Sequence, residues 1–269
     1  MRLIYIIACC GVLGMLALWL GKFKFMPKKL AVGIAAVGFF LTGGLTLLAV
    51  LPQNNFYGQV VVSVPMQKKL VALTYDDGPY LPYTLELLKV LQEKQVQATF
   101  FMVGENAFQK QEAVRAVSRQ GHEIALHAGS HRDLLRLDKE AVAANIDSGK
   151  VTLEWLSGKP VKYMRPPHGF RDWAVMEQIQ QAGLTAVNWS VIPRDWTNPG
   201  TDVIVDRVCS KVFPGAIILL HDGDSPKNAA SRQQTVEATA AIIDRLRLEG
   251  YDFVTVSQLM AAKEEEYSL

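Results

Sequence analysis

Residues 70–79 read LVALTYDDGP, a short apolar run followed by two adjacent aspartates and a Gly-Pro turn. An apolar run of six residues that ends at such a turn is typical of a buried strand. Parallel sheets, whose strands are covered on both faces, use runs of this kind. The stretch therefore predicts an inner strand that carries two carboxylates at its carboxyl end.

From this strand onward, strand and helix patterns alternate along the chain. Further strands are expected at residues 98–103, 122–127, 161–164, 184–189, 216–220 and 253–256. Helices are expected at residues 81–94, 107–119, 139–156, 173–182, 202–211 and 232–249. Seven strands that alternate with helices predict an α/β fold with a parallel sheet, either closed as a barrel or open and doubly wound. In both architectures ligands bind at the carboxyl ends of the strands.

The composition excludes several classes of protein. Hydrophobic residues make up 49% of the 269 residues, which is too many for a disordered chain, and three cysteines are too few for a disulfide scaffold or a cysteine zinc finger. Five of the 28 Lys and Arg precede residue 30, so the rest of the chain has 23 of them against 26 Asp and Glu. This slightly acidic remainder does not favour nucleic-acid binding, and no glycine-rich phosphate-binding motif favours a nucleotide.

The first fifty residues have the pattern of a membrane anchor. Residues 3–21 and 30–51 contain no charge, and each run is long enough as a helix to cross about 30 Å of hydrocarbon. The lysine-rich linker between them, KFKFMPKK at residues 22–29, is expected in the cytoplasm, which leaves both termini outside. A signal peptide followed by a single anchor is the alternative.

These patterns predict a multi-pass protein of the cell membrane whose main domain lies on the extracytoplasmic side. The expected segments are a membrane anchor at 1–52, a linker at 53–68, a catalytic domain at 69–262 and a tail at 263–269.

Polar residues follow the predicted strands at the points where these strands end. They are Asp76 and Asp77, His127 and His131, Arg165 and His168, Asp195 and Trp196, and His221 and Asp222. Four of the five histidines of the chain are in this set. A parallel sheet brings all of these side chains to one rim.

One carboxylate and two histidines four residues apart can bind a catalytic metal and leave coordination positions open for water. The second carboxylate is then free to act as a base, and a histidine at another strand end can act as an acid. Each motif alone has a simpler interpretation: the two aspartates can cap a turn, and an isolated HxxxH is more often not a metal site. Their joint occurrence at successive strand ends favours the catalytic site.

Five segments of the sequence resemble the polysaccharide deacetylase family, also called the NodB homology domain or carbohydrate esterase family 4. They are LTYDDGP at 73–79, HAGSH at 127–131, RPPHG at 165–169, Asp195–Trp196 and LLHD at 219–222. The resemblance runs from about residue 70 to residue 260. It implies a distorted (β/α) barrel of about seven strands and the removal of N-acetyl groups from a polymer of N-acetylated sugar.

The resemblance also implies a role for each residue. Asp77, His127 and His131 would bind the metal, which is expected to be Zn²⁺, with Co²⁺ and Ni²⁺ as alternatives. Asp76 would be the base, paired with Arg165, and His221 the acid, oriented by Asp195. The acetylated polysaccharide, peptidoglycan or a related glycan, would contact His168, Pro167, Trp196 and Tyr80, and the backbone N–H of His168 would stabilise the oxyanion.

Two positions depart from the family pattern. His168 stands where an aromatic residue, often Tyr, is common, and Ile192 stands where many relatives have an acid. Two other functions remain open: an O-acetyl polysaccharide esterase, and an inactive glycan-binding module of the cell envelope.

Some conspicuous residues are expected to be structural. We expect Trp155, Trp173 and Trp189 in the core and a local hydrogen bond for His122. The run KEEE at 263–266 is expected to be a solvated helix end or a frayed tail.

Overall fold

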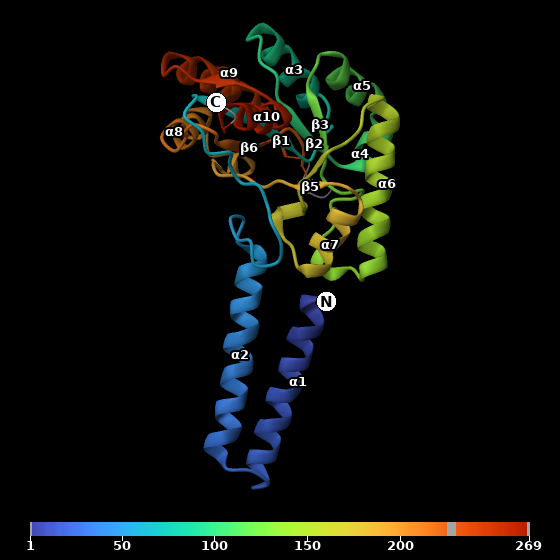
Figure 1. Ribbon diagram of the computed structural model, residues 1–269, viewed down its shortest axis with the longest axis vertical. Coiled ribbons are helices and arrows are strands. Elements are labelled where there is room, and N and C mark those ends of the chain that lie inside the picture. The colour runs from blue at the N-terminus through green and yellow to red at the C-terminus, as the bar shows by residue number, and fades with distance from the viewer. Residues whose placement is uncertain (1, 225–229, 268–269) are drawn as a thin grey trace.

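The computed structural model describes residues 2–224 and 230–267 (Figure 1). Residue 1 of the expected anchor and the last two residues of the expected tail lie outside this range. Helices α1 (Leu3–Lys22) and α2 (Lys28–Val50) form a hairpin that extends away from the rest of the chain (Figure 1). Most of their large apolar side chains are exposed, and both helices are long and apolar enough to cross a membrane.

Seven strands form the sheet of the main domain. They are β1 (Leu70–Asp76), β2 (Thr99–Met102), β3 (Glu123–Leu126), β4 (Tyr163–Met164), β5 (Thr185–Ala186), β6 (Ile217–His221) and β7 (Asp252–Phe253). Their order is β5-β4-β3-β2-β1-β6, β7 pairs with the start of β1, and every pairing is parallel.

Eight helices of the described chain follow these strands. They are α3 (Tyr83–Glu93), α4 (Gly104–Gln109), α5 (Gln111–Arg119), α6 (Lys139–Ser157), α7 (Trp173–Gln181), α8 (Thr201–Cys209), α9 (Gln233–Leu248) and α10 (Val256–Tyr267). Three 3-10 turns lie in the loops that follow strands: η1 (Leu134–Arg136), η2 (Pro167–Gly169) and η3 (Asp195–Thr197). The sheet is curled with helices around it, so the expected distorted (β/α) barrel with about seven parallel strands is confirmed and takes the form of a curled half-barrel (Figure 1).

Alternation along β1 explains why the sheet has two different faces. Successive strand residues point to opposite faces, and Val71, Leu73 and Tyr75 belong to the large core beneath the helices. Ala72 belongs to a second, smaller cluster that also contains Val256 and Leu259 of α10. Thr74 and Asp76 share the face of Ala72, so the interior of the curled sheet changes from apolar at its amino end to polar at its carboxyl end.

Residues 60–64 and 188–191 connect the outer strands of the sheet. Val61 pairs with Val187 just beyond β5, Ser63 pairs with Ala216 just before β6, and Val191 pairs with Ile218 of β6. Val60 and Val64, in the expected linker, are buried. These pairings bring β5 and β6 towards each other. The carboxyl ends of the strands, which carry the polar residues, therefore surround one opening.

Some local expectations are wrong. The expected helix at residues 107–119 is two helices, because the backbone leaves the helical region at Lys110 (φ −126°, ψ 49°). Trp155 is 62% exposed rather than in the core, and the guanidinium of Arg115 lies 5.9 Å from its ring. Trp189 and His122 are buried as expected, and Nδ1 of His122 accepts a hydrogen bond from the backbone N–H of Ala98.

The replacement Gly215→Ala tests how tightly residues 60–64 pack on the sheet. Gly215 has φ +84°, and an added Cβ would lie 1.8 Å from the carbonyl oxygen of Val64. Gly158 also has a positive φ, +67°, but its Cβ would meet nothing within 4 Å. We expect Gly158→Ala to cost about 1–2 kcal/mol of unfolding free energy and Gly215→Ala to cost clearly more. Denaturant unfolding of the detergent-solubilised chain measures both, and equal costs would contradict the close packing.

Candidate active site

Asp76 ends β1, Asp77 follows it directly, and both are buried. Asp76 points into the curled sheet, opposite Phe101 of β2 and His221 of β6. Asp77 has φ +75°, a left-handed conformation that aspartate tolerates better than most residues. This reversal of the backbone turns the second carboxylate towards the loop after β3 instead of the opposite face of the sheet.

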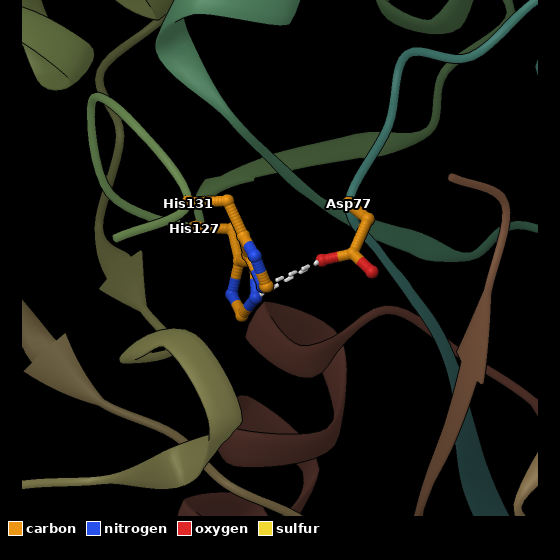
Figure 2. Close-up of side chains that lie close together, drawn as sticks. All are labelled: Asp77, His127 and His131. Atoms are coloured by element: carbon orange, nitrogen blue, oxygen red, sulfur yellow. Dashed lines mark ion pairs between the residues drawn. The ribbon is translucent and has the colours of Figure 1, made fainter. Parts of the chain in front are cut away.

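That loop carries His127 and His131, and both imidazoles point at one oxygen of Asp77 (Figure 2). Nε2 of His127 lies 3.3 Å from Oδ1 of Asp77, and Nε2 of His131 lies 3.1 Å from the same oxygen. The three side chains each offer one ligand atom, and these atoms all lie within 4.8 Å of one another. The structure thus brings together the three residues that the sequence predicts as metal ligands.

The donor set fits a divalent cation such as Zn²⁺. Oδ1 of Asp77 is buried and no hydrogen bond satisfies it, although two ring nitrogens lie near it. Burial acts to raise the pKa of Asp77, but His127 and His131 outweigh this effect and hold the pKa well below its usual range. One ionised carboxylate with two imidazoles is a typical catalytic zinc set, because it leaves at least one coordination position free.

Arg165, which follows β4, lies completely buried beneath Asp76. Its Nη1 donates to Oδ1 of Asp76 at 2.5 Å and to Oγ1 of Thr74 at 2.9 Å. Its other two nitrogens donate to the backbone carbonyls of Val187 and Asn188. Because every nitrogen of the guanidinium is bonded, its position is fixed, and it compensates the charge of Asp76 in the interior of the sheet.

On the other side of the opening, His221 ends β6 and is held by Asp195. Nδ1 of His221 lies 2.9 Å from Oδ1 of Asp195, and the backbone N–H of His221 donates to Oδ2 at 2.8 Å. The hydroxyl of Thr235 in α9 donates to the same Oδ2 at 2.9 Å. Burial acts to lower the pKa of His221, but the Asp195 carboxylate overcomes it and raises the pKa to about 9. His221 is therefore an imidazolium at neutral pH.

The two halves of the site line one cavity of roughly 390 Å³. Its walls include Asp76, Asp77, His127, His131 and His221, and its rim includes the exposed Trp196 and, beside His131, His168. Ile192, Leu219 and Trp189 give it an apolar side. Tyr80 and Pro167, also expected at the substrate, are not among the described residues that line this cavity, and the ring of Tyr80 stacks on Tyr83 instead.

Three residues of the site were not assigned from the sequence. Thr74 is two residues before Asp76, so strand alternation could have placed it on the same face. Thr235 comes from a distant helix and left no local signal. Asp222 is completely enclosed, its Oδ2 accepts a hydrogen bond from Thr84 at 2.6 Å, and burial raises its pKa to about 7.

The pKa of His221 tests the pairing with Asp195. We expect an NMR titration of the metal-free protein to give a pKa near 9 for His221, and a clearly lower pKa in Asp195→Asn, where the Asp195 carboxylate no longer opposes the effect of burial. Because the pKa is raised in the folded state, the stability that this pair contributes is complete below pH 6.5 and is lost as the pH rises through 9. His122 is an internal control, since burial lowers its pKa to about 4. An unchanged His221 pKa in the variant would contradict the assignment.

Comparison with known proteins identifies the domain. The polysaccharide deacetylase family model matches residues 63–187. A peptidoglycan-N-acetylglucosamine deacetylase of Bacillus cereus is 38% identical over 208 residues, which are 77% of this chain and 95% of that protein. A chitooligosaccharide deacetylase of Sinorhizobium fredii is 40% identical over 187 residues, which are 67% of this chain and 87% of that protein.

Comparison with solved structures leads to the same family. The crystal structure of a peptidoglycan N-acetylglucosamine deacetylase in complex with 4-naphthalen-1-yl-N-oxidanyl-benzamide matches with a TM-score of 0.70 and 33% identity, over 74% of this chain and 92% of that one. The peptidoglycan deacetylase PdaC of Bacillus subtilis matches with a TM-score of 0.67 and 31% identity, over 75% of this chain and 95% of that one. The chain thus belongs to the polysaccharide deacetylase family, carbohydrate esterase family 4, whose deacetylases are metal-dependent.

Proposed function

We propose that this protein hydrolyses N-acetyl groups on an N-acetylglucosamine polysaccharide, such as peptidoglycan, and releases acetate and a free amine. The observation that supports this most is that a metal-binding triad, a separate carboxylate and a separate imidazolium line one cavity. The relatives named as deacetylases of peptidoglycan and of chitooligosaccharides favour the same substrate class.

Asp77, His127 and His131 would hold the metal, most simply Zn²⁺. A divalent cation at such a site supplies a Lewis acid that polarises a carbonyl and lowers the pKa of water. The chain's own groups supply the proton transfers. Asp76, whose carboxylate is paired with Arg165, would accept the proton of the attacking water, and His221 would donate its proton to the amide nitrogen as the C–N bond breaks.

The hairpin of α1 and α2 would anchor the enzyme in the cytoplasmic membrane. The lysines of the short turn between the two helices favour a cytoplasmic position for that turn. The catalytic domain would then lie outside, where cell-wall glycan is accessible.

Acetate release from chitotetraose by the zinc-loaded full chain tests the proposed reaction. We expect a chelator, Asp77→Ala and His127→Ala each to reduce release to the level of buffer, together with loss of bound zinc. Asp244→Ala, which removes an exposed carboxylate paired with Lys94, should keep both zinc and activity. Parallel assays on O-acetylated xylan distinguish an O-acetyl esterase from an N-deacetylase. A zinc-loaded chain that releases no acetate from chitotetraose, from the xylan or from peptidoglycan would contradict the proposal.

The replacement Asp76→Asn separates the base from the metal site. It removes the proton acceptor but keeps the size of the side chain and a partner for Arg165. We expect kcat to fall by about 10²–10⁴-fold while the chain still binds one zinc ion. Elemental analysis and initial rates check this, and loss of zinc together with activity would place Asp76 among the metal ligands instead.

A further inference from the structure

The outer end of the hairpin contacts the same rim of the sheet that carries the active site. Nη1 of Arg2 donates to Oδ1 of Asp172 at 2.9 Å, and its Nη2 donates to the carbonyl of Leu134. Leu134 begins η1, in the loop after β3 that also carries His131, and Asp172 ends the loop after β4 that carries His168. Both loops follow strand carboxyl ends.

The polar groups of this joint are buried, and all but Nε of Arg2 take part in hydrogen bonds. Asp172 is 0% and Arg2 is 3% exposed. The Asp172 carboxylate also accepts from the backbone N–H groups of Leu3 at 3.0 Å and Val175 at 2.9 Å, so one side chain caps both α1 and α7. Breaking a buried ion pair costs several kcal/mol, because it leaves an uncompensated charge. The hairpin is therefore fixed to the domain at this joint.

Arg171 attaches the end of α2 to the same loop. This residue is 0% exposed, and its guanidinium donates to the carbonyls of Leu51 at 3.0 Å, Pro52 at 3.2 Å and Asn54. It also donates to the carbonyl of Gly169, next to His168, at 2.8 Å. Both helices of the hairpin thus end on the loop that borders the cavity.

Chain connectivity limits the distance between the active site and the hairpin. Leu134 follows His131 by three residues, and Asp172 follows His168 by four. An extended chain spans at most about 3.6 Å per residue, so these links are no longer than roughly 11–14 Å. The metal triad therefore lies close to the end of the hairpin at which α1 begins.

Aromatic residues gather at both ends of the hairpin. Trp173, the first residue of α7, contacts Phe56 and Tyr57 beyond the end of α2, with ring centroids 5.4 and 4.7 Å apart. At the opposite end of the hairpin, Trp19 contacts Phe23 and Phe25 beside the lysines of the turn. Such rings gather at both interfaces of a bilayer. In a bilayer spanned by the hairpin, Trp173 of the main domain would lie at the outer interface.

We propose that the active-site rim lies at the outer surface of the cytoplasmic membrane and that the substrate is an N-acetylated glycan carried on a membrane lipid. This inference rests on the proposed deacetylase function and narrows its substrate. Each headgroup layer is only about 5–8 Å thick, so a sugar linked to a lipid is held at the height of this rim. Because the joint fixes the site at the membrane surface, glycan farther out in the cell wall cannot reach it.

Vesicles that vary the height of the substrate test this proposal. The zinc-loaded full chain is reconstituted in phosphatidylethanolamine–phosphatidylglycerol vesicles together with chitotetraose coupled to a phospholipid headgroup. The tetraose is attached directly or through a rigid spacer of 20 prolines, which is about 60 Å long. We expect acetate release to be at least about tenfold faster without the spacer, because the fixed site cannot follow the raised sugar.

Equal rates, or a faster rate with the spacer, would overturn the membrane-surface site. Absence of acetate from every substrate, free chitotetraose included, would instead overturn the deacetylase function.

The variant Arg2→Gln tests the joint separately. We expect it to reduce the preference for the unspaced substrate at least threefold while the rate on free chitotetraose stays within twofold. Lys24→Gln, at the opposite end of the hairpin, is the matched control and should change neither rate. If Arg2→Gln leaves the height preference unchanged, the joint does not hold the site at the membrane surface.

Discussion

Two adjacent aspartates buried at the end of β1 impose the constraint on which the rest of this site depends. Asp76 and Asp77 cannot both stay ionised away from water unless cations compensate them. The chain supplies one such cation, the guanidinium of Arg165, which bonds to Asp76. For Asp77 it supplies two imidazoles and a buried oxygen without a hydrogen bond, an arrangement of groups that could hold a metal ion. In the proposed mechanism, Asp76 would then be the base and Asp77 a metal ligand.

The curled parallel sheet makes this division of roles geometrically feasible. Alternation along β1 turns Asp76 inward, and the left-handed backbone at Asp77 turns the second carboxylate towards the loop after β3. Pairing of β1 with β6 brings His221 beside Asp76, and Asp195 keeps this imidazole protonated at neutral pH. A carboxylate paired with a guanidinium and an imidazolium paired with a carboxylate therefore line one cavity.

The sequence predicted those features that depend on short-range patterns. The strand at residues 70–75 and the polar residues after each strand follow from apolar runs and motif spacing, and the choice of Asp77, His127 and His131 as the triad follows from the family resemblance. What it did not predict depends on distant contacts: Thr235 approaches Asp195 from α9, and Trp155 is exposed on α6 because its face of the helix does not meet the sheet. The joint between Arg2 and Asp172 joins residues 170 positions apart, and neither residue has a local signature.

X-ray absorption at the zinc edge, on the zinc-loaded full chain, measures the central claim most directly. The account predicts one zinc ion per chain, with two imidazole nitrogens at roughly 2.0–2.1 Å, oxygen ligands at roughly 2.0–2.2 Å, and loss of one imidazole contribution in His131→Ala. A zinc coordination shell without imidazole ligands, or one that His131→Ala leaves unchanged, would contradict the account.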